Sequence, residues 1–137
     1  MAETFKLTRH QANTMIEQAL DGDPREICGM IGGTGAVASK IFPTTNTDES
    51  EITYQIDPKE QFSVMKALRE DKLELVGIYH SHPETEAYPS STDTRLAFYP
   101  GAHYLIISLQ KKDDPTIRAF KIVDGVVSES TLLIETD

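Results

Sequence analysis

Residues 73–93 decide the fold, and they read LELVGIYHSHPETEAYPSSTD. Their first part, Leu73–His82, is a largely apolar run of the length that is typical of a buried central strand. A segment bounded by prolines, Pro83–Pro89, predicts a loop, and Ser90 after it is a good N-cap for a short helix. Two histidines therefore lie where a central strand ends, and an aspartate lies in the first turn of the next helix.

Upstream of this stretch, apolar periodicity and turn residues divide the chain into short elements. Phe5–Leu7 predicts a strand, and Thr8 is a plausible cap for a helix that should end near the turn at residues 21–24. The next expected elements are strands at Glu26–Ile31 and Ala36–Phe42 joined by a glycine-rich turn, a loop at Thr44–Glu51, and a short strand at Ile52–Ile56.

A second helix is expected to begin at Asp57, because this carboxylate can cap it and Pro58 suits the first helical position. Phe62, Met65 and Leu68 recur at about one helical turn. We therefore expect these three side chains to form the side of the helix that faces the core.

After residue 100 the pattern predicts only strands and turns. The expected strands are His103–Leu109, Ile117–Val123 and Val126–Ile134, with a hairpin turn at Asp124-Gly125. A chain of 137 residues is of single-domain size, so we expect one domain over residues 1–137. Its fold should be α/β (α+β), with a single mixed, mostly antiparallel curved sheet flanked by about three helices.

The composition excludes several classes of protein. A formal net charge of −9 argues against nucleic-acid and anionic-membrane binding, which need a basic surface. No apolar run is long enough for a transmembrane helix or a signal peptide. The single cysteine, Cys28, excludes an intramolecular disulfide and a multi-cysteine zinc finger, and it lies in an apolar run where a buried thiol is expected. We therefore expect a cytoplasmic protein.

The two histidines have the spacing of metal ligands. His80 and His82 are two residues apart on a strand, so their side chains point to the same face with Cα atoms roughly 6–7 Å apart. Asp93 falls in the first turn of the next helix, three residues after its cap Ser90. Two imidazoles and a carboxylate leave one coordination position for water, which is typical of a zinc hydrolase.

The whole pattern resembles the signature of the JAMM (MPN+) metalloproteases. It begins with His-Ser-His-Pro; seven residues separate the second histidine from a serine, and two more separate that serine from an aspartate. The resemblance includes an upstream glutamate, for which Glu26 in the segment Glu26–Gly32 is the match. It implies a JAMM/MPN-like (cytidine-deaminase-like) architecture and one Zn²⁺ per chain, held by His80, His82 and Asp93.

The resemblance also implies roles for two further residues. Glu26 would be the general base that activates water and later protonates the leaving amine, and Ser90 would hydrogen-bond the oxyanion. From the residues alone, Glu84 or Glu86 could equally serve as the base, because both neighbour His82. We favour Glu26, since it opens a strand that can lie next to the central one.

Two other functions compete with hydrolysis of an amide. His82-Pro83-Glu84 matches half of a zinc deaminase signature, but the other half needs two cysteines and the chain has one. The alternative that stays open is a non-catalytic MPN-type scaffold, since the family contains metal-free members.

A minimal chain of this kind resembles the prokaryotic members that process ubiquitin-like or sulfur-carrier proteins ending in Gly-Gly. The resemblance implies such a carrier as substrate, with the enzyme acting as a monomer or homodimer. A diglycine tail could pair with an exposed strand edge, for which Thr44–Ile56 is our candidate. The bond cut after Gly-Gly could be a peptide or an isopeptide bond, and the reaction could release cysteine or trim the carrier tail. The leaving group and the pathway are open at this point.

Overall fold

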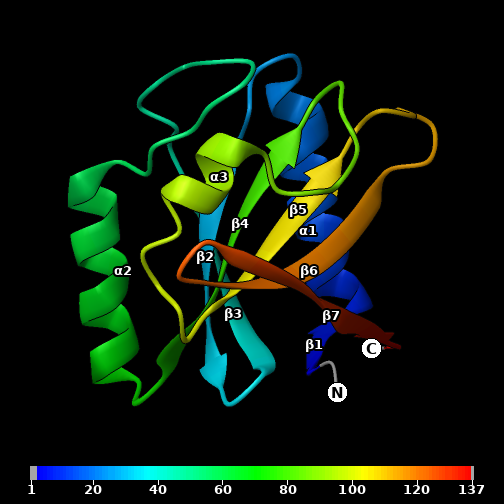
Figure 1. Ribbon diagram of the computed structural model, residues 1–137. Coiled ribbons are helices and arrows are strands. Elements are labelled where there is room, and N and C mark those ends of the chain that lie inside the picture. Colours follow the sequence, from blue (N-terminus) through cyan, green and yellow to red (C-terminus); the bar gives the residue numbers. More distant parts are fainter. Residues whose placement is uncertain (1–2, 137) are drawn as a thin grey trace.

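The computed structural model describes residues 3–136. Its helices and strands follow one another as labelled in Figure 1. The elements are β1 (Thr4–Thr8), α1 (Arg9–Gly22), β2 (Cys28–Thr34), β3 (Val37–Thr44), α2 (Pro58–Glu70), β4 (Glu74–His82), α3 (Ser91–Arg95), β5 (His103–Ser108), β6 (Thr116–Val123) and β7 (Val126–Glu135).

The strands form one mixed sheet in the order β1-β3-β2-β4-β5-β6-β7, with β7 pairing back on β1. Four of the strand pairs are antiparallel, and β1/β3, β1/β7 and β4/β5 are parallel. The expected α+β fold with a mostly antiparallel sheet and three helices is confirmed. The sheet is more curved than expected, because β7 pairs with β1 over five residue pairs and so closes a barrel, in which β1 and β3 are joined by the single pair Lys6 and Val37.

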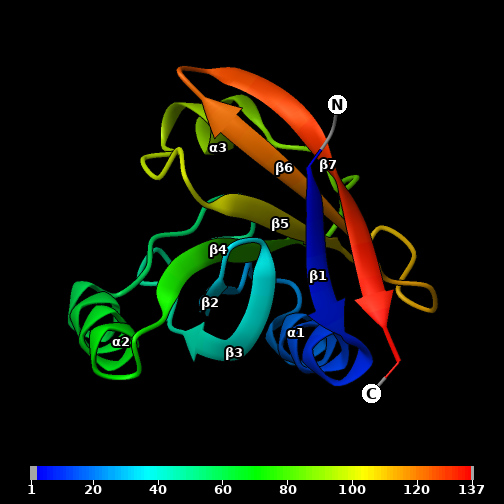
Figure 2. The same cartoon turned by 90° about the horizontal axis from the view of Figure 1, so that it is seen from below.

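α1 and α2 lie on opposite sides of β3, as Figure 2 shows. α1 begins with the expected cap, because Thr8 and Gln11 exchange side-chain to backbone hydrogen bonds. Its apolar side, Ala12, Met15 and Ala19, is buried in a cluster with residues of β1, β2, β4 and β5. This cluster is the main core, and it supports the sheet from the side of α1.

α2 packs on the sheet through a different side from the one expected. Val64 and Leu68 are buried against Met30, whereas Phe62 and Met65 are exposed. The expectation that Phe62, Met65 and Leu68 share the core side was therefore wrong for the first two. Residues 64 and 68 are four apart and lie on one face of the helix, while Phe62 lies away from that face.

The segment between β3 and α2 contains no strand, so the expectation of a strand at Ile52–Ile56 was also wrong. Its one ladder contact is the isolated bridge between Asn46 and Ile56. Backbone hydrogen bonds join Thr47 N to Gln55 O and Asp57 N to Thr45 O, which closes the segment into a loop. The segment therefore lies over the sheet instead of joining it.

β2 differs from the expected strand Glu26–Ile31 at both of its ends. The strand begins at Cys28, so Glu26 precedes it, and it continues through Thr34, so the hairpin turn is at Gly35-Ala36.

Among residues 3–136, no helix is long and apolar enough to cross a membrane.

Candidate metal centre

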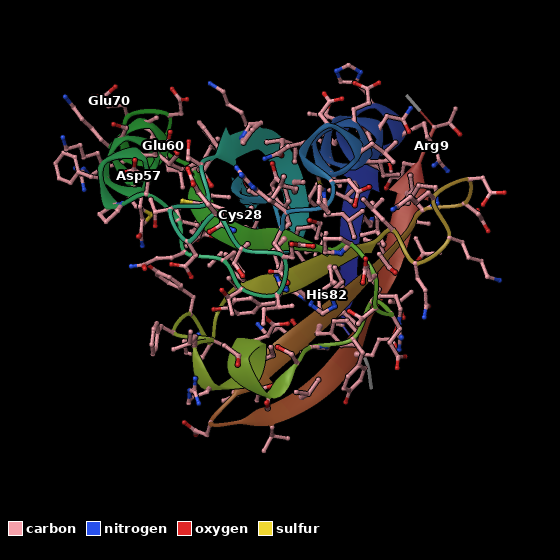
Figure 3. The ribbon with its side chains drawn as sticks, turned by 90° about the horizontal axis from the view of Figure 1, so that it is seen from above. Arg9, Cys28, Asp57, Glu60, Glu70 and His82 are labelled. Carbon is pink, nitrogen blue, oxygen red and sulfur yellow. The ribbon has the colours of Figure 1, made fainter. Side chains whose placement is uncertain are left out.

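The end of β4 presents two histidines to one face of the sheet. His80 and His82 lie on the same face as Ile78, which packs in the cluster with Tyr104 and Ile106. Both imidazoles are buried, with 1% and 5% of their surface exposed. Figure 3 looks down on this end of the molecule and shows His82 close to the sheet and to α3.

Ser81, between the histidines, points the other way and fastens the neighbouring segment. Its Oγ accepts a hydrogen bond from Ile27 N at 2.9 Å, and its N–H donates to Ile27 O at 3.0 Å. Ser81 thereby holds the residue next to Glu26 against β4. The serine of the His-Ser-His motif has this structural task, which the sequence pattern did not reveal.

α3 brings the carboxylate to the histidines through its cap. Ser90 Oγ accepts from Asp93 N at 3.0 Å, and Ser90 N donates to Asp93 Oδ2 at 2.9 Å, a capping box. The Ser90 hydroxyl accepts in this box and keeps its own proton to donate elsewhere. The box also fixes the Asp93 oxygen that faces the two imidazoles.

Three ligand atoms meet at this point. The Nε2 atoms of His80 and His82 lie 3.2 Å apart, and Asp93 Oδ2 lies 3.1 Å from the first and 3.0 Å from the second. In a tetrahedral zinc site with bonds of 2.0–2.1 Å, ligand atoms are about 3.3 Å apart. The three residues therefore form a group that can hold a metal ion, and their spacing fits zinc.

The protonation of His80 and Asp93 suits ligation. Burial holds the pKa of His80 below its usual value of 6.5, so this imidazole is neutral at neutral pH. Burial opposes ionisation of Asp93, but hydrogen bonds from His80 and His82 outweigh it and hold the Asp93 pKa well below its usual range. Burial opposes protonation of His82, but its bonds to Asp93 and, through Nδ1 at 2.9 Å, to the carbonyl oxygen of Glu86 outweigh it and raise its pKa, so a metal ion would displace a proton from Nε2.

Glu26 lies beside this group in a confined place. Its side chain is 4% exposed, and its Oε1 is buried without a hydrogen-bond partner among the described residues. Burial raises the pKa of Glu26 to about 8, while His82 lowers it and Asp93 raises it through their charges. A buried carboxyl with an unused oxygen and a raised pKa is typical of a functional acid or base.

The two alternative bases are placed differently. Glu84 and Glu86 are both exposed on the loop after β4, and Glu86 contributes its backbone carbonyl to His82. The geometry therefore favours Glu26 over either of them.

Cys28 is buried, as expected, with its Sγ 3.4 Å from Thr44 Oγ1. Burial raises the pKa of its thiol to about 11, so it is not a nucleophile at neutral pH.

Two hollows adjoin the ligand group. One, of about 580 Å³, is lined by Glu26, His82 and Ser90 together with residues 50–52 and 83–85. The other, of about 400 Å³, reaches Asp93 from the side of α2, and its other walls include Tyr54, Ile56, Leu96, Phe98, Tyr99 and Tyr104. Glu26 lines only the first hollow, and Asp93 only the second.

Sequence reasoning missed two residues next to this centre, Asn46 and Tyr54. Asn46 Nδ2 donates to Glu26 O at 3.0 Å. The Tyr54 ring stacks on His80 with centroids 4.4 Å apart. Both residues are far from the motif in sequence, and no local pattern marks them.

Comparison with known proteins agrees with the fold. A family model described as "Prokaryotic homologs of the JAB domain" matches residues 8–123. A CysO-cysteine peptidase of Mycobacterium tuberculosis is 39% identical over 119 residues, which cover 85% of this chain and 82% of the relative. A desampylase of Haloferax volcanii is 37% identical over 95 residues, 67% of this chain and 68% of the relative.

A solved structure shows the same fold. The solution structure of a protein from Desulfitobacterium hafniense superposes with a TM-score of 0.88 at 35% identity, covering 97% of this chain and 94% of that one. The barrel and its three helices therefore follow a backbone that experiment has found in a relative.

Proposed function

The chain belongs to the family of prokaryotic homologues of the JAB domain, and from this membership we propose that it is a zinc-dependent peptidase acting on conjugates of ubiquitin-like or sulfur-carrier proteins. The proposal places one Zn²⁺ per chain on His80, His82 and Asp93. It makes Glu26 the general base and Ser90 the donor to the oxyanion.

One observation carries this proposal: the three ligand atoms meet within 3.2 Å of one another beside a buried glutamate with an unpartnered oxygen. A metal-free scaffold needs neither feature. A buried carboxyl without a partner costs stability, and such a cost is typical of a catalytic site.

Zinc at this centre would polarise the scissile carbonyl and lower the pKa of a water to about 7. Glu26 would take the proton of the attacking water and hand it to the leaving nitrogen, which must depart as an amine. Both transfers need a carboxylate that faces the substrate, and Glu26 lines the same hollow as His82 and Ser90. The Ser90 hydroxyl would donate its free proton to the oxygen that becomes negative in the tetrahedral intermediate.

The names of the relatives support the substrate class. The peptidase of Mycobacterium tuberculosis is named for a bond to cysteine, and the desampylase of Haloferax volcanii for the removal of a modifier. We propose that the carrier's Gly-Gly tail lies in the hollow that reaches Asp93, and that the leaving group lies in the hollow lined by Glu26. Glycine residues suit such a place because they lack side chains and let the backbone approach the metal closely.

This placement replaces the expectation that the tail pairs with a strand edge at Thr44–Ile56, since no strand lies between β3 and α2. Tyr54 and Ile56 would instead contact the tail as walls of the hollow. A cytoplasmic location completes the proposal, and the lone buried Cys28 suits a reducing compartment.

A panel of carrier fusions tests the proposed function. Carriers ending in Gly-Gly would be joined to a single amino acid, to a peptide, or to a lysine side chain, and kcat/KM measured for each with the zinc-loaded protein. We expect at least one class to be cut directly after Gly-Gly, and a Gly-Gly to Ala-Ala change in the tail to reduce kcat/KM by about 100-fold or more. Zinc-loaded protein that cuts none of the three classes would contradict the proposal.

A further inference from the structure

We propose that the segment 45–56 supplies two positioning residues to the centre, Asn46 for Glu26 and Tyr54 for His80. The part concerning Asn46 rests on the proposed function, because it takes Glu26 as the base. The part concerning Tyr54 assumes only that His80 is a metal ligand.

Glu26 needs support because no strand carries it. β2 begins at Cys28, so the backbone of Glu26 takes no part in the strand ladder. One side chain and one loop carbonyl hold it instead: Glu26 N donates to Ser50 O at 2.8 Å, and Glu26 O accepts from Asn46 Nδ2 at 3.0 Å. Both contacts come from the segment 45–56, so this segment holds the Glu26 backbone itself, while Ser81 holds its neighbour Ile27.

The Asn46 amide is used to its full capacity. Nδ2 donates to Glu26 O and to Thr53 O, and Oδ1 accepts from the backbone N–H groups of Asp48 and Gln55. An amide offers two N–H donors on one atom and two lone pairs on the other, and each is matched here. Aspartate has the same shape but no N–H to donate, so it would lose the bond to Glu26. Asn46 therefore joins the two arms of the loop to the residue that carries the base.

Tyr54 orients a metal ligand that lacks the usual hydrogen bond. His82 is fixed through its Nδ1 by the Glu86 carbonyl, whereas Nδ1 of His80 is buried with no partner among the described residues. The Tyr54 ring stacks on the His80 ring at 4.4 Å between centroids and 20° between planes. An aromatic stack of this geometry restricts the tilt of the imidazole, and so directs Nε2 towards Asp93.

Asn46→Ala, made alone and in combination with Glu26→Gln, tests the role of Asn46. Alone, Asn46→Ala should lower kcat about 10-fold or more, with KM within about twofold and one zinc still bound per chain. In a Glu26→Gln background, the same change should lower the residual kcat less than about twofold, because Asn46 acts through the carboxylate. Asn46→Asp should resemble Asn46→Ala, since both lack the donor.

Thr47→Val is the matched control for the segment. Thr47 Oγ1 donates to Gln55 O at 3.2 Å, so this change removes a bond within the loop and none to Glu26. It should leave kcat within about twofold. Equal losses from Asn46→Ala with and without Glu26→Gln would show a merely structural role and overturn this part of the inference. If instead Glu26→Gln alone keeps full activity, the assignment of the base fails, which is a different outcome.

Zinc affinity tests the role of Tyr54 without any substrate. Competition with a chromophoric chelator should give Tyr54→Leu a Kd about 10-fold weaker than the native chain, in the range of changes to residues that orient ligands. Tyr54→Phe keeps the ring and should bind zinc with the native Kd. A native Kd for Tyr54→Leu, or an equal weakening for Tyr54→Phe, would contradict the stacking role.

Discussion

β4 and β5 run side by side in parallel, and buried histidines lie at both ends of this pair. At one end His80 and His82 close β4, and at the other His103 opens β5 opposite Gly77. His103 is only 3% exposed, so burial does not distinguish it from the other two. The difference lies in what surrounds each imidazole.

His103 lies against the Phe5 ring, with 4.9 Å between centroids, and its Nε2 has no hydrogen-bond partner among the described residues. Burial lowers its pKa, and the charge of Lys121 lowers it further. At the opposite end, two Nε2 atoms and a carboxylate oxygen converge within 3.2 Å. Convergence on a shared carboxylate, and not burial of a histidine, is therefore what makes a candidate metal site.

The same substitution at the two ends should give the largest contrast. His82→Ala removes a proposed ligand and should weaken zinc binding more than about 100-fold, with loss of turnover. His103→Ala should keep one zinc per chain and turnover within about threefold, while lowering the free energy of unfolding by about 1–3 kcal/mol through the cavity it leaves. Metal analysis, chelator competition and thermal unfolding measure these effects, and loss of zinc from His103→Ala would break the comparison.

Glu26→Gln separates catalysis from metal binding at the end of β4 that carries His80 and His82. We expect kcat to fall about 10²- to 10⁴-fold, because the amide cannot accept the proton of water, while zinc stays bound. Steady-state kinetics with metal analysis of the same sample checks both halves. Substantial residual turnover would move the base to another residue, for which Glu84→Gln and Glu86→Gln are the next variants.

Ser90→Ala should have a smaller effect on catalysis. Loss of an oxyanion donor should lower kcat about 100-fold, and loss of the cap should cost about 1 kcal/mol of stability. Ser91→Ala is the matched control, since Ser91 is the exposed first residue of α3 and is not its cap. If the two variants have equal kcat, Ser90 acts only as a cap.

The smallest effect concerns stability and pH in the metal-free protein, where the two ends should respond in opposite directions. The pKa of Glu26 is raised to about 8 in the folded chain, so stability decreases as pH rises from 4.5 towards 8. The pKa of His103 is lowered, so its contribution is lost as pH falls below 6.5.

Unfolding by denaturant across this pH range measures the direction in which the free energy of unfolding changes with pH. Relative to the native chain, Glu26→Gln should be about 1–3 kcal/mol more stable at pH 8. His103→Phe should lose less stability than the native chain as pH falls below 6.5. A Glu26→Gln variant that is no more stable at pH 8 than the native chain would show that Glu26 is well solvated.

The sequence predicted most of the fold because its signals are local. Thr8 caps α1, Asp57 and Pro58 begin α2, and Asp124-Gly125 forms the last hairpin. The errors came where tertiary contacts decide. The loop 45–56 is held by Asn46 and by the backbone of Glu26, and propensity alone cannot distinguish it from a strand. Phe62 was expected on the core side because it recurs at helical spacing with Met65 and Leu68, but Val64 and Leu68 lie on the side that meets the sheet.

The site was predictable to the extent that its residues are close in sequence. His80, His82 and Asp93 lie within one strand, loop and helix start, so their spacing alone suggested a metal group. Glu26 is about fifty residues away and was assigned only through the family resemblance. Tyr54 could not be found, because a ring stacked on His80 leaves no pattern in the sequence.

Zinc content linked to turnover tests the central claim most directly. Protein purified without chelator would be analysed for metal, stripped, and reloaded with zinc, with hydrolysis of a Gly-Gly carrier conjugate measured at each stage. The account predicts about one zinc per chain, loss of turnover with the metal, and recovery of both on reloading. A chain that carries no zinc, takes up none when it is added, and shows the same turnover at every stage would contradict the account.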